Sequence, residues 1–148
     1  MRNNTIRLDA LMPLIRERLA SGESVRFSPH GTSMLPMLKD GRDQVILSPL
    51  PDKLKKFDLP LYQRENGQYV LHRIVKVTDG YTCMGDNQFV QEKGLRHDQM
   101  IAVVTRYIHN GKEYSTESFQ YKVYCRLWCI TRPFRYFCLK VRNVLRCN

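Results

Sequence analysis

A serine and a histidine give this sequence its clearest chemical feature. Ser33 lies in Gly31-Thr32-Ser33-Met34-Leu35-Pro36, where a glycine before it and a proline after it favour a sharp, stiff turn. A serine hydroxyl attacks well only when a neighbouring base removes its proton. His72 is one candidate base, because it lies in the strand-like run from Tyr69 to Val77 and imidazole titrates near neutral pH. His30 is a second candidate, and spacing along the chain does not choose between them.

Asp86, in Gly85-Asp86-Asn87, is a candidate third member of the site. It would hold the tautomer of the imidazole and stabilise the imidazolium that forms during proton transfer. Each of the three residues also has an ordinary interpretation: a loop serine, a structural strand histidine, and an aspartate that favours a turn. The residue types alone therefore leave a catalytic and a structural hypothesis side by side.

Three segments in order resemble the signal peptidase I superfamily, and within it the endoplasmic-reticulum and archaeal branch with a Ser–His pair. They are Gly31-Thr32-Ser33-Met34-Leu35-Pro36, Leu71-His72-Arg73-Ile74-Val75 and Met84-Gly85-Asp86-Asn87. The bacterial branch and the LexA-type self-cleaving repressors place a lysine where this chain has His72. The resemblance covers about Val25 to Tyr107. It implies a mainly β fold with coiled antiparallel sheets, and a serine endopeptidase that needs no metal or cofactor. It also implies an extended peptide substrate added as a strand, with small side chains before the cut.

The resemblance also implies roles for individual residues. Ser33 would be the nucleophile, His72 the general base and Asp86 the supporting acid. The backbone N–H of Ser33 would help to form the oxyanion hole. The residues expected to support the oxyanion and the loop are Gly31, Thr32, Met34 and Pro36.

Two positions depart from the family pattern. Many bacterial members have a hydroxyl residue where this chain has Gly31, which leaves Thr32 as a candidate for the second oxyanion donor. The endoplasmic-reticulum branch has a further Asp soon after Gly-Asp-Asn. Residues 88–93 contain no Asp here, and Glu92 is the acid that could substitute.

The elements that would position these residues follow from the spacing of apolar residues. Residues 1–22 are expected to form an amphipathic helix, with apolar side chains at three- and four-residue steps between Leu8 and Leu19 and Gly22 at its end. Residues 23–117 are expected to form the β catalytic domain, because apolar residues alternate there. The dipeptides Asn66-Gly67, Asp79-Gly80 and Asn110-Gly111 predict its hairpins.

Residues 118–148 are expected to form a basic amphipathic helical tail, kinked or split at Pro133. This segment contains no Asp or Glu, and the whole chain carries a net charge of +10, which predicts an anionic partner. The tail could pack on the β domain, or it could lie in a membrane interface, and the two alternatives can hold for different halves. The residues expected to contact a membrane or another anion are Lys122, Arg126, Trp128, Arg132 and Arg135.

Composition argues against several other classes of protein: membrane-spanning, secreted and zinc-binding. No apolar run approaches the ~20 residues of a membrane-spanning helix, and Met1–Asp9 does not resemble a signal peptide. The five cysteines are expected to be reduced thiols, and Cys125 and Cys129 lack the further ligands of a zinc site. We therefore expect a cytoplasmic protein, peripheral on the inner face of the membrane if the tail docks there, acting on a peptide or leader segment.

Two other functions stay open. The chain could be an inactive peptide-binding module of the same fold, or a basic protein that binds membranes or nucleic acid. A LexA-like repressor needs a helix-turn-helix before the β domain, whereas the first 24 residues predict one helix. Specific nucleic-acid recognition is therefore not expected, and only non-specific phosphate binding by the tail is compatible with the sequence.

Overall fold

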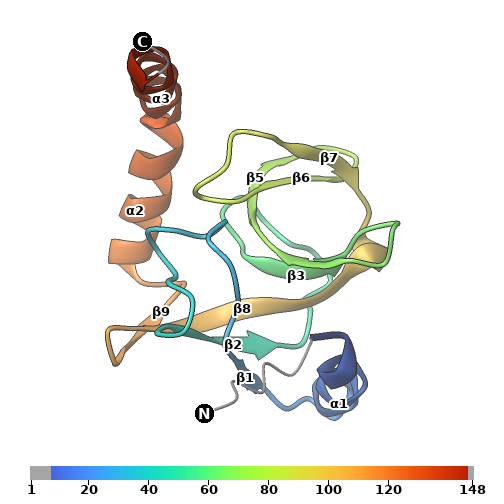
Figure 1. The fold of residues 1–148 in the computed structure, drawn as a ribbon. Coiled ribbons are helices and arrows are strands. Elements are labelled where there is room, and N and C mark those ends of the chain that lie inside the picture. Colours follow the sequence, from blue (N-terminus) through green and yellow to red (C-terminus); the bar gives the residue numbers. More distant parts are fainter. Residues whose placement is uncertain (1–7, 147–148) are drawn as a thin grey trace.

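Two antiparallel sheets form the centre of the molecule, and helices lie at its two ends (Figure 1). The structure is a computed structural model that describes residues 8–146. Within that range it is mainly β, with nine strands and three α-helices. In chain order the elements are α1 (Leu8–Ala20), β1 (Val25–Phe27), β2 (Gln44–Ser48), β3 (Pro60–Gln63), β4 (Tyr69–Leu71), β5 (Arg73–Val77), β6 (Tyr81–Met84), β7 (Glu92–Leu95), a 3-10 turn (His97–Gln99), β8 (Met100–His109), β9 (Lys112–Ser115), α2 (Phe119–Ile130) and α3 (Arg132–Arg146).

The larger sheet is organised around the long strand β8. Its strand order is β1-β2-β8-β3-β4, and β9 pairs with the end of β8. The smaller sheet has the order β5-β6-β7. All of these pairs are antiparallel. β4 and β1 therefore lie at the two edges of the larger sheet, and β4 leads directly into the smaller one.

The three hairpins predicted from turn dipeptides are confirmed. Asn66-Gly67 joins β3 to β4, Asp79-Gly80 joins β5 to β6, and Asn110-Gly111 joins β8 to β9. Gly67, Asn110 and Gly111 have positive φ angles, which Gly and Asn tolerate best. Local turn chemistry thus determined three strand pairings.

The apolar pattern predicts one strand from Tyr69 to Val77. The structure instead divides this run between the two sheets. Its first three residues pair with β3 in the larger sheet, and the residues from Arg73 onward pair with β6 in the smaller sheet. His72 is the single residue between them. No Gly, Pro, Asn or Asp marks this point, since one residue alone separates β4 from β5.

The helices also follow the apolar spacing. α1 buries Met12, Ile15 and Leu19 against the larger sheet's core, and Asp9 lies in its first turn. The expected split near Pro133 is present: α2 ends at Ile130, and α3 begins at Arg132 with Pro133 in its first turn, where proline is tolerated. α2 buries Tyr121 and Cys125, so the first half of the tail packs on the β domain.

Cys83, Cys125, Cys129 and Cys138 are free thiols, and Cys147 lies outside the described residues. Within residues 8–146 no helix has the length and apolar character needed to cross a bilayer.

Candidate active site

Ser33 lies on a turn that is anchored in the protein core. Backbone N–H groups of Leu35 and Leu38 donate to the carbonyl oxygens of Thr32 and Met34, at 3.2 and 2.9 Å. Met34, Met37 and Leu38 are buried in the main apolar cluster, whereas Ser33 is half-buried. Apolar anchors on one side of the turn therefore leave the serine hydroxyl at the surface of a rigid segment.

The segment after β6 holds the backbone of this serine from the other side. The N–H of Asn87 donates to the carbonyl oxygen of Ser33 at 2.8 Å, and its side-chain amide donates to the carbonyl oxygen of Thr32 at 3.2 Å. A Cβ atom at Gly85 would lie 2.6 Å from the Ser33 carbonyl oxygen. Gly85 is thus required for this close approach, and Gly85-Asp86-Asn87 acts as a clamp on the serine turn.

His72 is held by one ring nitrogen. The residue is 3% exposed, and its Nδ1 lies 3.2 Å from Glu92 Oε1 and 3.3 Å from the Tyr62 hydroxyl. A neutral imidazole that donates from Nδ1 to the carboxylate carries its lone pair on Nε2, as a general base requires. Among the described residues Nε2 has no hydrogen-bond partner, and His72 lines a cavity of about 340 Å³.

Burial favours the neutral form of His72 at pH 7. Burial lowers the pKa of His72 below its ordinary value, and the negative charge of Glu92 offsets part of that shift. Burial by itself would raise the pKa of Glu92, but hydrogen bonds from Arg64 and Tyr62 hold it below the ordinary value. Glu92 is therefore ionised beside a neutral imidazole.

Ser33 and His72 line the same cavity, with Thr32, Arg64 and Gln88 also in its wall. The structure thus brings together the two residues that the sequence analysis placed first. In the described part of the chain no hydrogen bond joins Ser33 Oγ to His72. Catalytic hydrogen bonds often tighten only when substrate binds.

The rival histidine lines the cavity too. His30 Nδ1 lies 2.8 Å from Asp40 Oδ1, and the second carboxylate oxygen of Asp40 accepts the N–H of Gly31 at 3.0 Å. The side chain of His30 is more than half exposed, unlike that of His72. Both histidines are oriented by a carboxylate at Nδ1, and they differ chiefly in burial.

Asp86 occupies a different position from the one that the resemblance implies. Its carboxylate is fully buried and accepts two hydrogen bonds of 2.8 Å from Arg73 and one of 2.9 Å from the Tyr124 hydroxyl. None of its hydrogen bonds within residues 8–146 reaches His72. Through these contacts Asp86 anchors the clamp, of which it is the middle residue. The carboxylate beside His72, the position expected for Asp86, is that of Glu92.

Helices α2 and α3 bind the clamp as well. Arg73, also fully buried, donates to the Tyr121 hydroxyl at 2.7 Å and contacts Cys125 Sγ at 2.8 Å. Trp128 Nε1 donates to the carbonyl oxygen of Asp86 at 2.8 Å, and Arg135 Nη1 donates to the same oxygen at 3.3 Å. Trp128 and Arg135, expected at a membrane, instead contact the β domain.

Sequence reasoning missed several residues of this site. The sequence does not single out Tyr62, Arg64 and Gln88, because a strand tyrosine and isolated polar residues carry no pattern of their own. It indicates Glu92 only as a substitute acid. Glu92 follows His72 by 20 positions, and only the pairing of β7 with β6 carries it to the imidazole.

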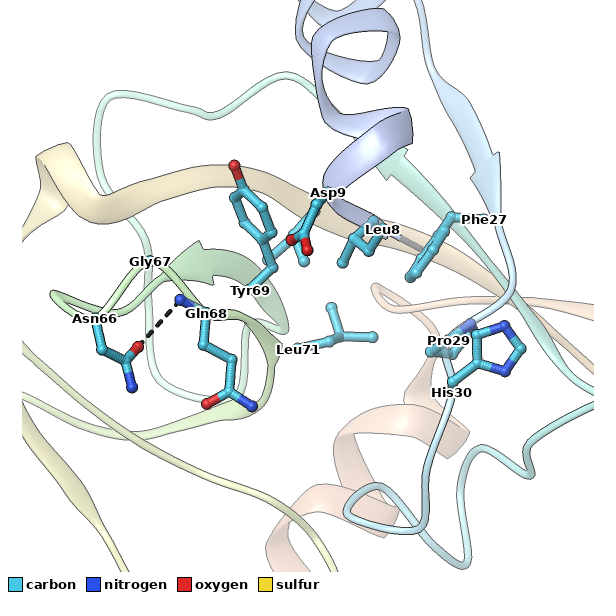
Figure 2. Close-up of a pocket in the computed structure, with 11 residues that line it drawn as sticks. Leu8, Asp9, Phe27, Pro29, His30, Asn66, Gly67, Gln68, Tyr69 and Leu71 are labelled. Atoms are coloured by element: carbon cyan, nitrogen blue, oxygen red, sulfur yellow. Dashed lines mark hydrogen bonds between the residues drawn. The ribbon is translucent and has the colours of Figure 1, made fainter. Parts of the chain in front are cut away.

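A second cavity, of about 690 Å³, adjoins the first. Figure 2 shows its lining, with Leu71 between the Phe27 side and the Asn66-Gly67 turn. The lining residues common to both cavities are Pro29, His30, Gln68, Tyr69 and Leu71. The two cavities therefore form one groove along the edge strand β4, with Ser33 and His72 at one end.

The described residues contain no cluster of three or more His, Cys, Asp or Glu side chains that could hold a metal ion. Comparisons with protein-family models, with curated proteins and with solved structures found no match to this chain.

Proposed function

We propose that this protein is a serine endopeptidase of the signal-peptidase type, with Ser33 as nucleophile and His72 as general base. The observation that carries the proposal is the shared cavity: Ser33 lies on an anchored turn, and His72 is held at Nδ1 by Glu92 while Nε2 is left without a partner. The arrangement of the sheets would then be a variant of the signal-peptidase and LexA fold.

The chemistry follows from these positions. Ser33 Oγ attacks the carbonyl carbon of the scissile peptide bond as its proton passes to His72 Nε2. The tetrahedral oxyanion accepts a hydrogen bond from the Ser33 N–H, and Thr32 or Gln88 would supply a second donor from the cavity wall. Breaking of the C–N bond transfers the proton from His72 to the leaving amine. Water, deprotonated by the same imidazole, then hydrolyses the acyl-enzyme.

The substrate proposed for this site is an extended peptide. β4 is an edge strand whose next residue is His72, so a peptide added along that edge would run toward the nucleophile. Leu8, Phe27 and Leu61 in the adjoining cavity would accept an apolar side chain of the peptide. Small side chains just before the cut are expected from the resemblance. The proposed substrate is a cytoplasmic peptide or a leader segment.

The test is cleavage of a peptide library, analysed by mass spectrometry, with the wild type and three variants. Ser33→Ala should abolish cleavage, and His72→Ala should lower its rate by about 10²–10⁴-fold, the usual contribution of a general base. His30→Ala is the matched control, since His30 lines the same cavity and is also paired with a carboxylate. It should retain most of the activity. Equal cleavage by wild type, Ser33→Ala and His72→Ala would refute the proposal. Loss of cleavage in both Ser33→Ala and His30→Ala, with His72→Ala active, would assign the base to His30.

An inactive peptide-binding module is the second candidate. It is favoured by the absence of a Ser33–His72 hydrogen bond among the described residues and by Gly31 in place of a hydroxyl residue. Covalent labelling of Ser33 by a serine-directed acylating reagent, lost in His72→Ala, would contradict it. Peptide binding without labelling or cleavage would favour it over the enzyme.

A further inference from the structure

The tail helices carry an apolar stripe that faces away from the protein. Six large apolar side chains exposed along α2 and α3 form this stripe: Phe119, Leu127, Ile130, Phe134, Phe137 and Val141. Tyr136, also exposed on α3, lies off the stripe and its ring contacts that of Phe89. The stripe residues follow one another in steps of three, four or eight residues, so they share one side of a helix that turns about 100° per residue. Ile130, Phe134 and Phe137 are 74%, 70% and 63% exposed.

The packed side of the tail lies opposite this stripe. Tyr121, Cys125, Trp128 and Arg135 contact the β domain or the Asp86 segment. The helical repeat places these four residues about half a turn away from the stripe. The N–H groups of Thr131 and Arg135 donate to carbonyl oxygens four residues earlier, at 2.9 and 3.0 Å, which continues the helical pattern across the junction. Figure 1 shows α3 continuing from the end of α2, at the opposite end of the molecule from α1.

Charge identifies the kind of surface that would cover the stripe. Residues 118–148 contain no Asp or Glu. The helical repeat places Lys122, Arg126 and Lys140 along one border of the stripe. Lys122 also pairs with Glu117 at 3.0 Å. Two copies that met through this stripe would bring basic borders together without opposing acids, which disfavours a dimer. Nucleic acid would satisfy the charge but would leave the phenyl groups in water.

We propose that the stripe on α2 and α3 docks the protein on an anionic lipid bilayer surface. The apolar side chains enter the interface, and the basic border contacts lipid phosphates. Trp128 and Arg135 take no part, because they already bind the Asp86 carbonyl oxygen. Since the stripe lies opposite the packed face, docking needs no change in the contacts that hold the clamp on Ser33. Docking through the stripe does not depend on the chemistry of Ser33 and His72.

The test is flotation of the full-length chain with vesicles of phosphatidylcholine alone and of phosphatidylcholine mixed with phosphatidylglycerol. We expect the wild type to float with the anionic vesicles, and added salt to weaken this binding. Phe134→Gln combined with Phe137→Gln should lower the partition coefficient by about tenfold or more, because two phenyl groups no longer leave water. Arg126→Gln combined with Lys140→Gln should lower the partition coefficient on the anionic vesicles and leave it unchanged on vesicles of phosphatidylcholine alone.

The matched controls lie elsewhere on the surface. Leu14→Gln with Val77→Gln removes two other exposed apolar side chains, and Arg16→Gln with Arg26→Gln removes two other exposed charges. Both control pairs should float like the wild type, and all variants should unfold as cooperatively as the wild type. Equal flotation of stripe and control variants would overturn the proposal. So would DNA binding without vesicle binding, or a lipid-free dimer that the stripe variant abolishes.

Discussion

Gly85→Ala is the most direct test of the clamp on Ser33. The added methyl carbon would lie 2.6 Å from the Ser33 carbonyl oxygen, against 3.4 Å or more for an ordinary contact, so the two must separate by 0.8 Å. Overpacking of this kind costs about 1–3 kcal/mol. The 2.8 Å hydrogen bond from the Asn87 N–H to the same oxygen would lengthen, at a cost of about 1 kcal/mol. We therefore expect a loss of about 2–4 kcal/mol in the free energy of unfolding.

The same displacement should lower activity. A shift of about 1 Å at a reacting group can cost 10²-fold in rate, so Gly85→Ala should cleave or acylate roughly 30- to 100-fold more slowly. Gly80→Ala is the matched control, because its Cβ would lie 2.8 Å from another backbone carbonyl oxygen, that of Leu95, and Gly80 belongs to the turn between β5 and β6. Neither glycine has a positive φ angle, so the backbone conformation suits alanine at both positions.

The assay combines urea unfolding with the rate of Ser33 acylation by a serine-directed reagent, followed by mass spectrometry. Both variants should be destabilised, and only Gly85→Ala should acylate slowly. Equal acylation rates in two folded variants would refute the reasoning, since the clamp would then not position the nucleophile. A stable Gly85→Ala protein would refute the packing argument itself.

Three further predictions concern the groups around His72 and Asp86. Because burial lowers the pKa of His72, the neutral base should persist below pH ~6.5, and the acid limb of the kcat/KM profile should lie below that value; an acid limb well above it would contradict His72 as the base. Glu92→Gln removes a charge that raises this pKa, so the acid limb should move to lower pH and the rate should fall, whereas Glu65→Gln, at an exposed position, should change neither. Arg73→Met leaves the buried Asp86 carboxylate unpaired and should cost about 3–5 kcal/mol in urea unfolding; Arg73→Met combined with Asp86→Asn should recover part of that loss, and an additive double variant would argue against the ion pair.

Much of the fold could be predicted because it depends on short stretches of chain. Asn66-Gly67 and Asn110-Gly111 specify hairpins through their own backbone preferences, and the apolar spacing of α1 identifies its buried face. Ser33 and His72 could be selected as a pair from residue chemistry combined with a motif resemblance. Their common cavity could not be predicted by spacing, since 39 positions separate them.

The acidic residues Asp86 and Glu92 show most clearly what the sequence determines and what the tertiary structure decides. By itself the sequence determined which groups can ionise, where turns occur and that the tail is basic and amphipathic. The tertiary structure alone decided that Glu92 contacts His72 while Asp86 pairs with Arg73, and that Trp128 faces the protein rather than the outside. The physical reason is that turns and helical faces arise from neighbours along the chain. The partner of a buried charge is instead chosen by which distant segments pack together and exclude water.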